Sequence, residues 1–311
     1  MSIKINSIVQ EKTFKNNNIR LRSCNNNSIN RENVLERNPQ RDSVSFKGLT
    51  PVAFGEILKN INTTNSLSFA QKLIKKMYES RVCNFQMIAE VVKMQFPAVA
   101  VKSMQELAKV IPDSAKYRAY SSFELSPSFE RIDLNMYLKL PDDRHEIPLF
   151  VSDASHEYTH LSQHFREVDD IEILKNVSGG NRSIAETLVA IYESTFSTLD
   201  TNALTYLPIV KRKDGFKVID EHVKGIVSSF LEQISNEADP MHMQNVLEVY
   251  SNHSNLIFDV KRYCALKSRR EKEAYATEYL ISKVLGQNNS DVYKQTVEFF
   301  ADLEDALGRS V

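Results

Sequence analysis

The residues best suited to chemistry are His156, Glu157 and His160, in the run His-Glu-Tyr-Thr-His at 156–160. On a helix, residues four apart lie on the same face, so His156 and His160 would direct two imidazoles to one point, as two metal ligands must. Glu157 lies about 100° further round such a helix, near enough to act on a metal-bound water without binding the metal itself. The spacing therefore predicts metal-assisted hydrolysis, with two histidine ligands, one general base and an open coordination position.

The flanking residues favour a helix over this run. Pro148 precedes the segment, Ser152 is the expected N-cap, and Asp153 lies in the first turn, where the helix dipole favours a negative charge. The helix has an apolar stripe that His156 and His160 avoid, formed by Ala154, Tyr158, Leu161 and Phe165. We therefore expect an apolar back packed on the core and a polar front facing a metal.

A β-hairpin is predicted before this helix. Between Arg131 and Leu140, apolar side chains occupy every second position, a period typical of a half-buried strand. A looser alternation runs from Tyr117 to Leu125 and is followed by the turn signal Ser-Pro-Ser at 126–128. The two alternating runs are therefore predicted to pair.

Strands that lead into a helix carrying H-E-x-x-H resemble the zincin metallopeptidases, and the motif is the zinc-protease signature. The resemblance implies that His156 and His160 bind Zn²⁺, that Glu157 is the general base, and that the substrate is a peptide or protein. In that family an edge strand just before the active helix binds the substrate backbone by strand addition. Residues Ile132 to Leu138 are accordingly the expected substrate edge.

Zinc requires a third protein ligand. The longer form H-E-x-x-H-x-x-G-x-x-H is excluded, because Gln163 and Arg166 stand where it needs Gly and His. His164 lies one turn beyond His160, roughly 6 Å along the helix axis, which is too far for a shared coordination sphere. We expect His164 beside the metal ligands or at the surface.

A glutamate on a later helix is the expected third ligand, because the chain resembles the gluzincins, the thermolysin-like zincins. The best match to their E-x-E-A run is Glu271-Lys-Glu-Ala at 271–274, whose first Glu would bind zinc. Glu273 in the same run, and Glu186 closer to the motif, remain alternatives. The family often has an Asp four residues after the ligand, bonded to a zinc histidine. Tyr275 stands there, a departure that leaves the second contact of that histidine unassigned.

Composition limits the class of protein. A chain of 311 residues with 42% hydrophobic residues can bury a sizeable core in one or two domains. The formal net charge of −1 gives no whole-chain attraction to nucleic acid, and no apolar run reaches the roughly 18 residues of a membrane span. The three cysteines are scattered and no apolar signal region is visible, which predicts a cytoplasmic protein or one exported without a signal peptide.

We expect an α+β protein that is predominantly helical. Residues 1–48 are polar and basic and are predicted to be disordered. Residues 49–115 are predicted to form a helical N-terminal subdomain. Residues 116–311 would form a zincin-like catalytic domain, with a small antiparallel sheet before the H-E-x-x-H helix and a long helical insertion at about 167–245.

Helical periodicity continues over most of the chain after residue 51. Within the N-terminal part it predicts helices at Phe85–Met94 and Val101–Val110. Towards the C-terminus it predicts one long helical stretch from about Met241 to Leu285. Gly286 is a C-cap signal for that stretch, and Ser290 is expected to start the last helix.

Two functions are open at this point. One is a zinc-dependent peptidase; the other is a non-catalytic helical interaction protein with a vestigial or structural metal site. Glu157 favours the peptidase, because a purely structural site has no use for a base. A basic cluster on the expected ligand helix either meets an acidic substrate or solvates the helix: Lys267, Arg269, Arg270 and Lys272.

Overall fold

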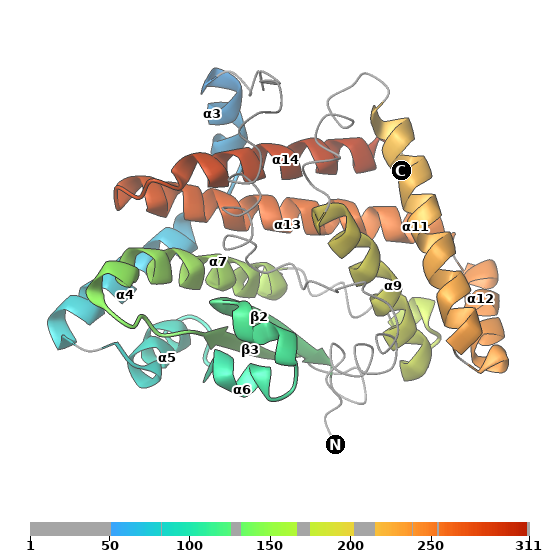
Figure 1. The fold of residues 1–311 in the computed structure, drawn as a ribbon, viewed down its shortest axis with the longest axis horizontal. Helices are drawn as coiled ribbons and strands as arrows, with labels where there is room; N and C mark the ends of the chain where they lie inside the picture. Colours follow the sequence, from blue (N-terminus) through green and yellow to red (C-terminus); the bar gives the residue numbers. More distant parts are fainter. Residues whose placement is uncertain are drawn as a thin grey trace.

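A computed structural model describes residues 51–81, 83–125, 132–166, 175–201, 215–237, 239–253 and 255–309. Within these residues helices surround one small sheet, which confirms the predicted α+β class with predominant helix (Figure 1). None of the described helices is long and apolar enough to cross a membrane. The segment 1–48, predicted to be disordered, lies outside the described residues.

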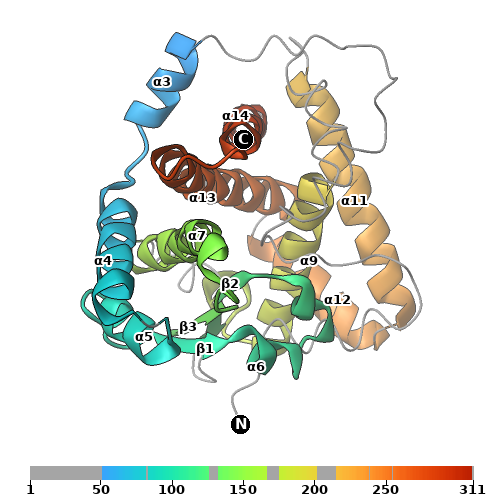
Figure 2. The same cartoon turned by 60° about the vertical axis from the view of Figure 1, so that its left-hand side comes forward.

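Helix α7 (Ile147–Arg166) carries the H-E-x-x-H residues and packs against the sheet, with α4 (Thr64–Ser80) beside it (Figure 2). Helix α5 (Phe85–Lys93) confirms one predicted helix and covers the sheet next to α4. A single apolar core joins these three helices to the strands and includes Phe69, Leu73, Ile88, Val92, Met136, Phe150, Ala154, Tyr158 and Leu161. The last three belong to the apolar stripe predicted for the active helix, and their position in the core confirms the stripe at these residues. The side chain of Phe165, the fourth member, lies outside the described part of the structure.

The start of α7 differs from the prediction. The helix begins at Ile147, ahead of Ser152, because Pro148 is accommodated in the first turn, where its missing N–H interrupts no hydrogen bond. Ser152 is buried inside the helix instead of capping it. Asp153 is buried too, and its Oδ2 accepts a hydrogen bond of 2.9 Å from Nε of Arg118.

The sheet contains β1 (Ala100–Ser103), β2 (Ala119–Leu125) and β3 (Ile132–Leu138), in the order β1-β3-β2. Strands β2 and β3 pair antiparallel, which confirms the predicted hairpin, whereas β1 pairs parallel to β3. The turn predicted at 126–128 lies outside the described residues.

Two predictions about this sheet are wrong. Strand β3 lies between β1 and β2, so Ile132–Leu138 is not an edge open to a substrate. The helix predicted at Val101–Val110 is a strand followed by the short helix α6 (Met104–Ala108). The helix starts only there because Ser103 forms a capping box with Glu106, which leaves the preceding residues extended.

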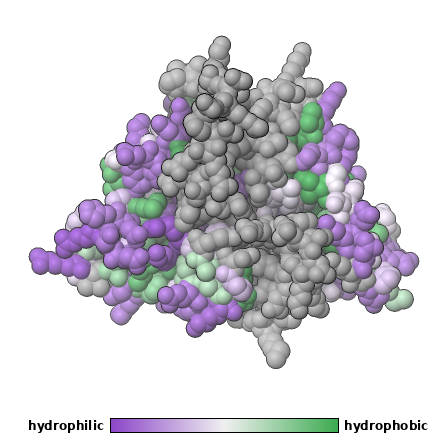
Figure 3. All heavy atoms as spheres, viewed as in Figure 1, coloured by the Kyte–Doolittle hydropathy of each residue, from purple (hydrophilic) through white to green (hydrophobic). Residues whose placement is uncertain are grey.

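A second layer of helices covers the side of α7 away from the sheet and continues down beside the sheet, where α9 and α12 lie (Figure 2). It consists of α3 (Pro51–Lys59), α9 (Arg182–Thr201), α11 (Gly215–Glu237), α12 (Pro240–His253), α13 (Leu256–Val284) and α14 (Ser290–Gly308). Its core includes Ile191, Phe196, Leu199, Val223, Val260, Tyr275, Val297 and Phe300. On the face drawn in Figure 3, most of the coloured residues at the left and right are hydrophilic, as expected for the outer sides of amphipathic helices.

The long helical stretch predicted from Met241 to Leu285 is two helices, α12 and α13. Asn255 begins α13 because its side-chain oxygen accepts hydrogen bonds from the backbone N–H groups of Ile257 and Phe258. At the other end the predicted cap is confirmed: Gly286 has a φ of +69° and the helix stops there.

Candidate metal centre

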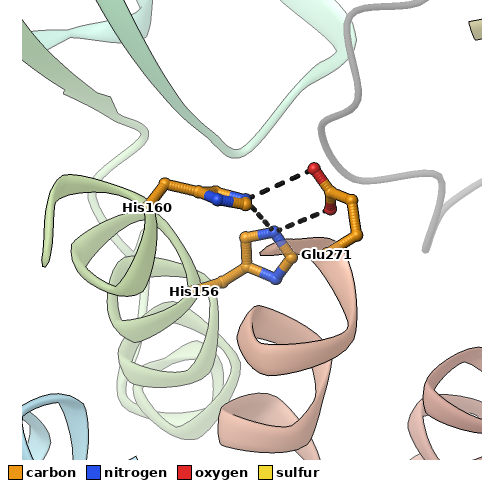
Figure 4. Close-up of side chains that lie close together, drawn as sticks. All are labelled: His156, His160 and Glu271. Atoms are coloured by element: carbon orange, nitrogen blue, oxygen red, sulfur yellow. Dashed lines mark hydrogen bonds and ion pairs between the residues drawn. The ribbon is translucent and has the colours of Figure 1, made fainter. Parts of the chain in front are cut away.

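The three side chains expected to bind metal lie together where α7 packs against α13 (Figure 4). His156 and His160 project from α7, and Glu271 projects from α13. The three residues are buried, with exposed fractions of 0%, 8% and 1%. One ligand atom from each lies within 4.8 Å of the others, which is close enough to bind one metal ion.

The distances between the nitrogens and oxygens of the three side chains are short enough for one metal ion to contact all three. Nε2 of His156 and Nε2 of His160 are 3.0 Å apart. Oxygens of Glu271 lie 3.6 Å from Nε2 of His156 and 3.5 Å from Nε2 of His160. Ligands at zinc bond lengths of about 2.1 Å are separated by about 3.4 Å in a tetrahedron. Oε2 of Glu271 is also buried without a hydrogen-bond partner, an acceptor that a cation would satisfy.

The other candidate ligands lie elsewhere. Glu186 pairs with Arg182 one turn earlier on α9, at 2.7 Å between Oε1 and Nε. Oε2 of Glu273 accepts a hydrogen bond of 3.0 Å from Gln163. His164 is outside the group of potential ligands, as expected from its spacing. Of the three glutamates considered, the structure brings Glu271 to the histidines.

Gln163 holds His160 in a defined orientation. Its Oε1 is 2.9 Å from Nδ1 of His160, and its Nε2 donates hydrogen bonds of 3.0 Å to the Arg270 carbonyl and to Glu273. Because the amide nitrogen donates to those two oxygens, the amide oxygen must accept from Nδ1–H of His160. Nε2 of His160 therefore carries the lone pair that faces the candidate site.

Glu278 has the corresponding position behind His156, and sequence reasoning did not assign it this role. Its buried Oε2 lies 3.4 Å from Nδ1 of His156, a charge contact longer than an ordinary hydrogen bond. Tyr275, four residues after Glu271, instead packs its ring edge-on against the imidazole at 4.8 Å between centroids. The available signal was the spacing of seven residues between Glu271 and Glu278, about two helical turns, which places both on one face of α13.

Glu157 is fully buried, and neither of its carboxylate oxygens has a hydrogen-bond partner among the described residues. Burial raises its pKa to about 7, against the opposing effects of His156 and of the Ser121 hydroxyl on β2. A carboxyl group with this pKa exchanges a proton readily near neutral pH. Its position beside His156 suits the predicted role of a base that does not bind the metal.

The charges of the centre also favour a cation. Burial lowers the pKa of His160 to about 4, which leaves its imidazole neutral and able to bind metal. Burial opposes protonation of His156 too, but the neighbouring Glu278 and Glu271 outweigh it and raise the pKa of His156 well above its usual value. Burial and the charge of Glu278 raise the pKa of Asp153 to about 7. These carboxyl groups repel one another in a buried space, and a bound cation would relieve the repulsion.

No protein-family model, curated protein sequence or solved structure matches this chain. The resemblance to the zincins drawn from the H-E-x-x-H motif and the E-x-E-A run therefore stays a prediction.

Proposed function

We propose that the protein is a zinc-dependent metallopeptidase of the gluzincin type, with His156, His160 and Glu271 as the zinc ligands. The observation that carries the proposal is the close approach of the three ligand side chains, with separations of 3.0 to 3.6 Å between their nitrogens and oxygens, because one zinc ion could contact all three. Glu157 lies beside them as a fully buried carboxyl group whose pKa is raised to about 7, and a structural site would have no use for such a group. The interaction-protein alternative leaves this carboxylate without a role.

Each residue of the site has its own proposed role in peptide hydrolysis. Zinc, when bound, would lower the pKa of the attacking water and polarise the peptide carbonyl. Glu157 accepts the proton of the attacking water and transfers it to the leaving amine. Gln163 and Glu278 hold the two imidazoles so that each Nε2 points towards Glu271.

Strand β2 is the proposed binding edge for the peptide backbone, in place of β3. It forms the edge of the described sheet that packs on α7. Ser121 on this strand is near enough to Glu157 to influence its pKa. A peptide added alongside β2 would therefore pass close to the proposed base.

The zinc content of purified variants tests the ligand set. His156→Ala, His160→Ala and Glu271→Ala should each lose most of the zinc, since each removes one of three ligands. Glu186→Ala and Glu273→Ala should retain about one zinc per chain, because neither side chain reaches the site. Metal analysis after dialysis gives the readout. Undiminished zinc in both histidine variants would overturn the proposal.

A further inference from the structure

Helix α13 lies between α7 and α14 (Figure 2). One face of α13 carries four buried side chains that are four, three and four residues apart: Glu271, Tyr275, Glu278 and Ser282. The first is a proposed zinc ligand, and the next two contact His156 on α7. A side chain of α14 that packs along this face would therefore touch the residues that hold His156 in place.

Tyr293 of α14 is such a side chain. Asn289 precedes α14, but its side chain does not cap the helix. Instead its Oδ1 accepts a hydrogen bond of 2.9 Å from the hydroxyl of Ser282, and its Nδ2 donates one of 3.0 Å to the hydroxyl of Tyr293. The ring of Tyr293 lies 6.4 Å from the ring of Tyr275, measured between centroids. The buried Tyr293 therefore extends from Tyr275 towards the turn of Ser282 and crosses the position of Glu278 between them.

The hydroxyl of Tyr293 has a proton to donate. Because its oxygen accepts from the Asn289 amide, its O–H is available for a further acceptor. Burial, followed by the charges of Glu278 and Asp153, raises the pKa of Tyr293 above its usual value, and the Ser152 hydroxyl has a smaller, opposing effect. The phenol therefore stays protonated with two carboxylates nearby. Oε2 of Glu278 is buried and has no hydrogen-bond partner among the described residues, which suits it to accept this proton.

We propose that the hydroxyl of Tyr293 binds the Glu278 carboxylate and holds it behind His156, an inference that rests on the zinc site of the proposed function. Oε2 of Glu278 lies 3.4 Å from Nδ1 of His156, which is longer than an ordinary hydrogen bond, so that contact alone does not fix the carboxylate. Asp153, the other nearby carboxylate, already accepts a hydrogen bond of 2.9 Å from Arg118. Tyr293 is thus a positioning residue, which orients the imidazole of His156 through Glu278.

Zinc affinity, measured by competition with a chelator of known affinity, tests this role without requiring catalysis. Tyr293→Phe removes the hydroxyl and keeps the ring beside Tyr275. It should weaken zinc binding by about tenfold and shift the visible absorption of the Co²⁺-loaded protein, which depends on the geometry of the ligands. Tyr279→Phe is the matched control and should bind zinc as the wild type does. Tyr279 follows Glu278 on α13, but its hydroxyl accepts a hydrogen bond of 3.4 Å from the exposed Lys283.

A second background, Glu278→Ala, separates this role from a general effect on the fold. There Tyr293→Phe should cause no further loss of zinc affinity, because the hydroxyl acts only through Glu278. An equal further loss in that background, or wild-type affinity in folded Tyr293→Phe, would overturn this inference alone. Wild-type protein that takes up no zinc would overturn the proposed function as well. A wild type that shows the Tyr293 effect on zinc but cleaves no peptide would support the positioning role and count against the peptidase.

Discussion

Glu157 is one of the buried carboxylates of the centre, and neither of its oxygens has a hydrogen-bond partner within ordinary geometric limits among the described residues. Asp153 pairs with Arg118, Glu278 faces His156, and Glu271 faces both histidines. A buried polar group without a partner is destabilising, so its presence calls for a compensating role. In the proposed reaction that role is to exchange a proton with the attacking water and the leaving amine.

The substitution Glu157→Gln should preserve zinc content and fold while reducing peptide hydrolysis by about 10² to 10⁴-fold. The amide has nearly the shape of the carboxylate but cannot accept the proton. Cleavage of a diverse peptide library by wild type and variant, each with and without chelator, provides the measurement. Chelator-sensitive cleavage that survives in Glu157→Gln would show that another residue is the base. A wild type that cleaves no peptide would favour the interaction protein.

Replacement of Glu278 tests the contact behind His156. Glu278→Gln should weaken zinc binding by about 10- to 100-fold, because a neutral amide no longer stabilises the Nδ1–H of the ligand imidazole. Competition with a chelator of known affinity measures the change. Glu248→Gln, on the exposed side of α12, is the control and should bind zinc as the wild type does. Equal affinities for the three proteins would mean that Glu278 has no part in holding His156.

At the scale of elements, the active helix was largely predictable because its signals are local. The spacing of His156 and His160, and the apolar stripe behind them, depend only on helical periodicity. The central position of β3 was not predictable, because alternation along one strand does not reveal that two other strands pair with it. The same applies to β1, a run of four residues whose extended form is stabilised by its parallel neighbour.

For the ligand helix α13, too, some features could be predicted from the sequence and others could not. The E-x-E-A run identified Glu271 by its resemblance to known sites. The roles of Gln163 and Glu278 depend on how α7 and α13 turn towards each other, which their separate sequences do not specify. The break before Asn255 was missed because helical periodicity continues on both sides of it.

The end of α13 provides a stability prediction at this scale. Gly286→Ala should destabilise the protein by about 1 kcal/mol, because a side chain is disfavoured at a φ of +69°. Gly225→Ala, inside α11, is the matched control and should stabilise by about 0.5 to 1 kcal/mol, since a Cβ there meets no atom within 4 Å. Urea unfolding measures both. Equal effects of the two substitutions would contradict the cap assigned to Gly286.

For the whole molecule, the candidate metal centre lies between two cores. The histidine helix α7 packs with the sheet, α4 and α5, and the glutamate helix α13 contributes Val260, Cys264 and Tyr275 to the other core. The two helices meet directly, and the three ligands lie on facing sides of that contact. One metal ion would therefore bridge the two layers in addition to its chemical role.

Removal of zinc should therefore lower the stability of the whole protein. A ligand present at 100 times its Kd stabilises the folded state by about 2.7 kcal/mol, which for a protein of this size corresponds to about 4 °C in Tm. Thermal unfolding of the zinc-loaded protein, before and after chelation, measures the shift, and added zinc should restore it. His160→Ala should show no shift with chelator, since it lacks a ligand from the start. If the wild type lost its zinc without any change in Tm, the ion would not bind between α7 and α13, where it would hold the two layers together.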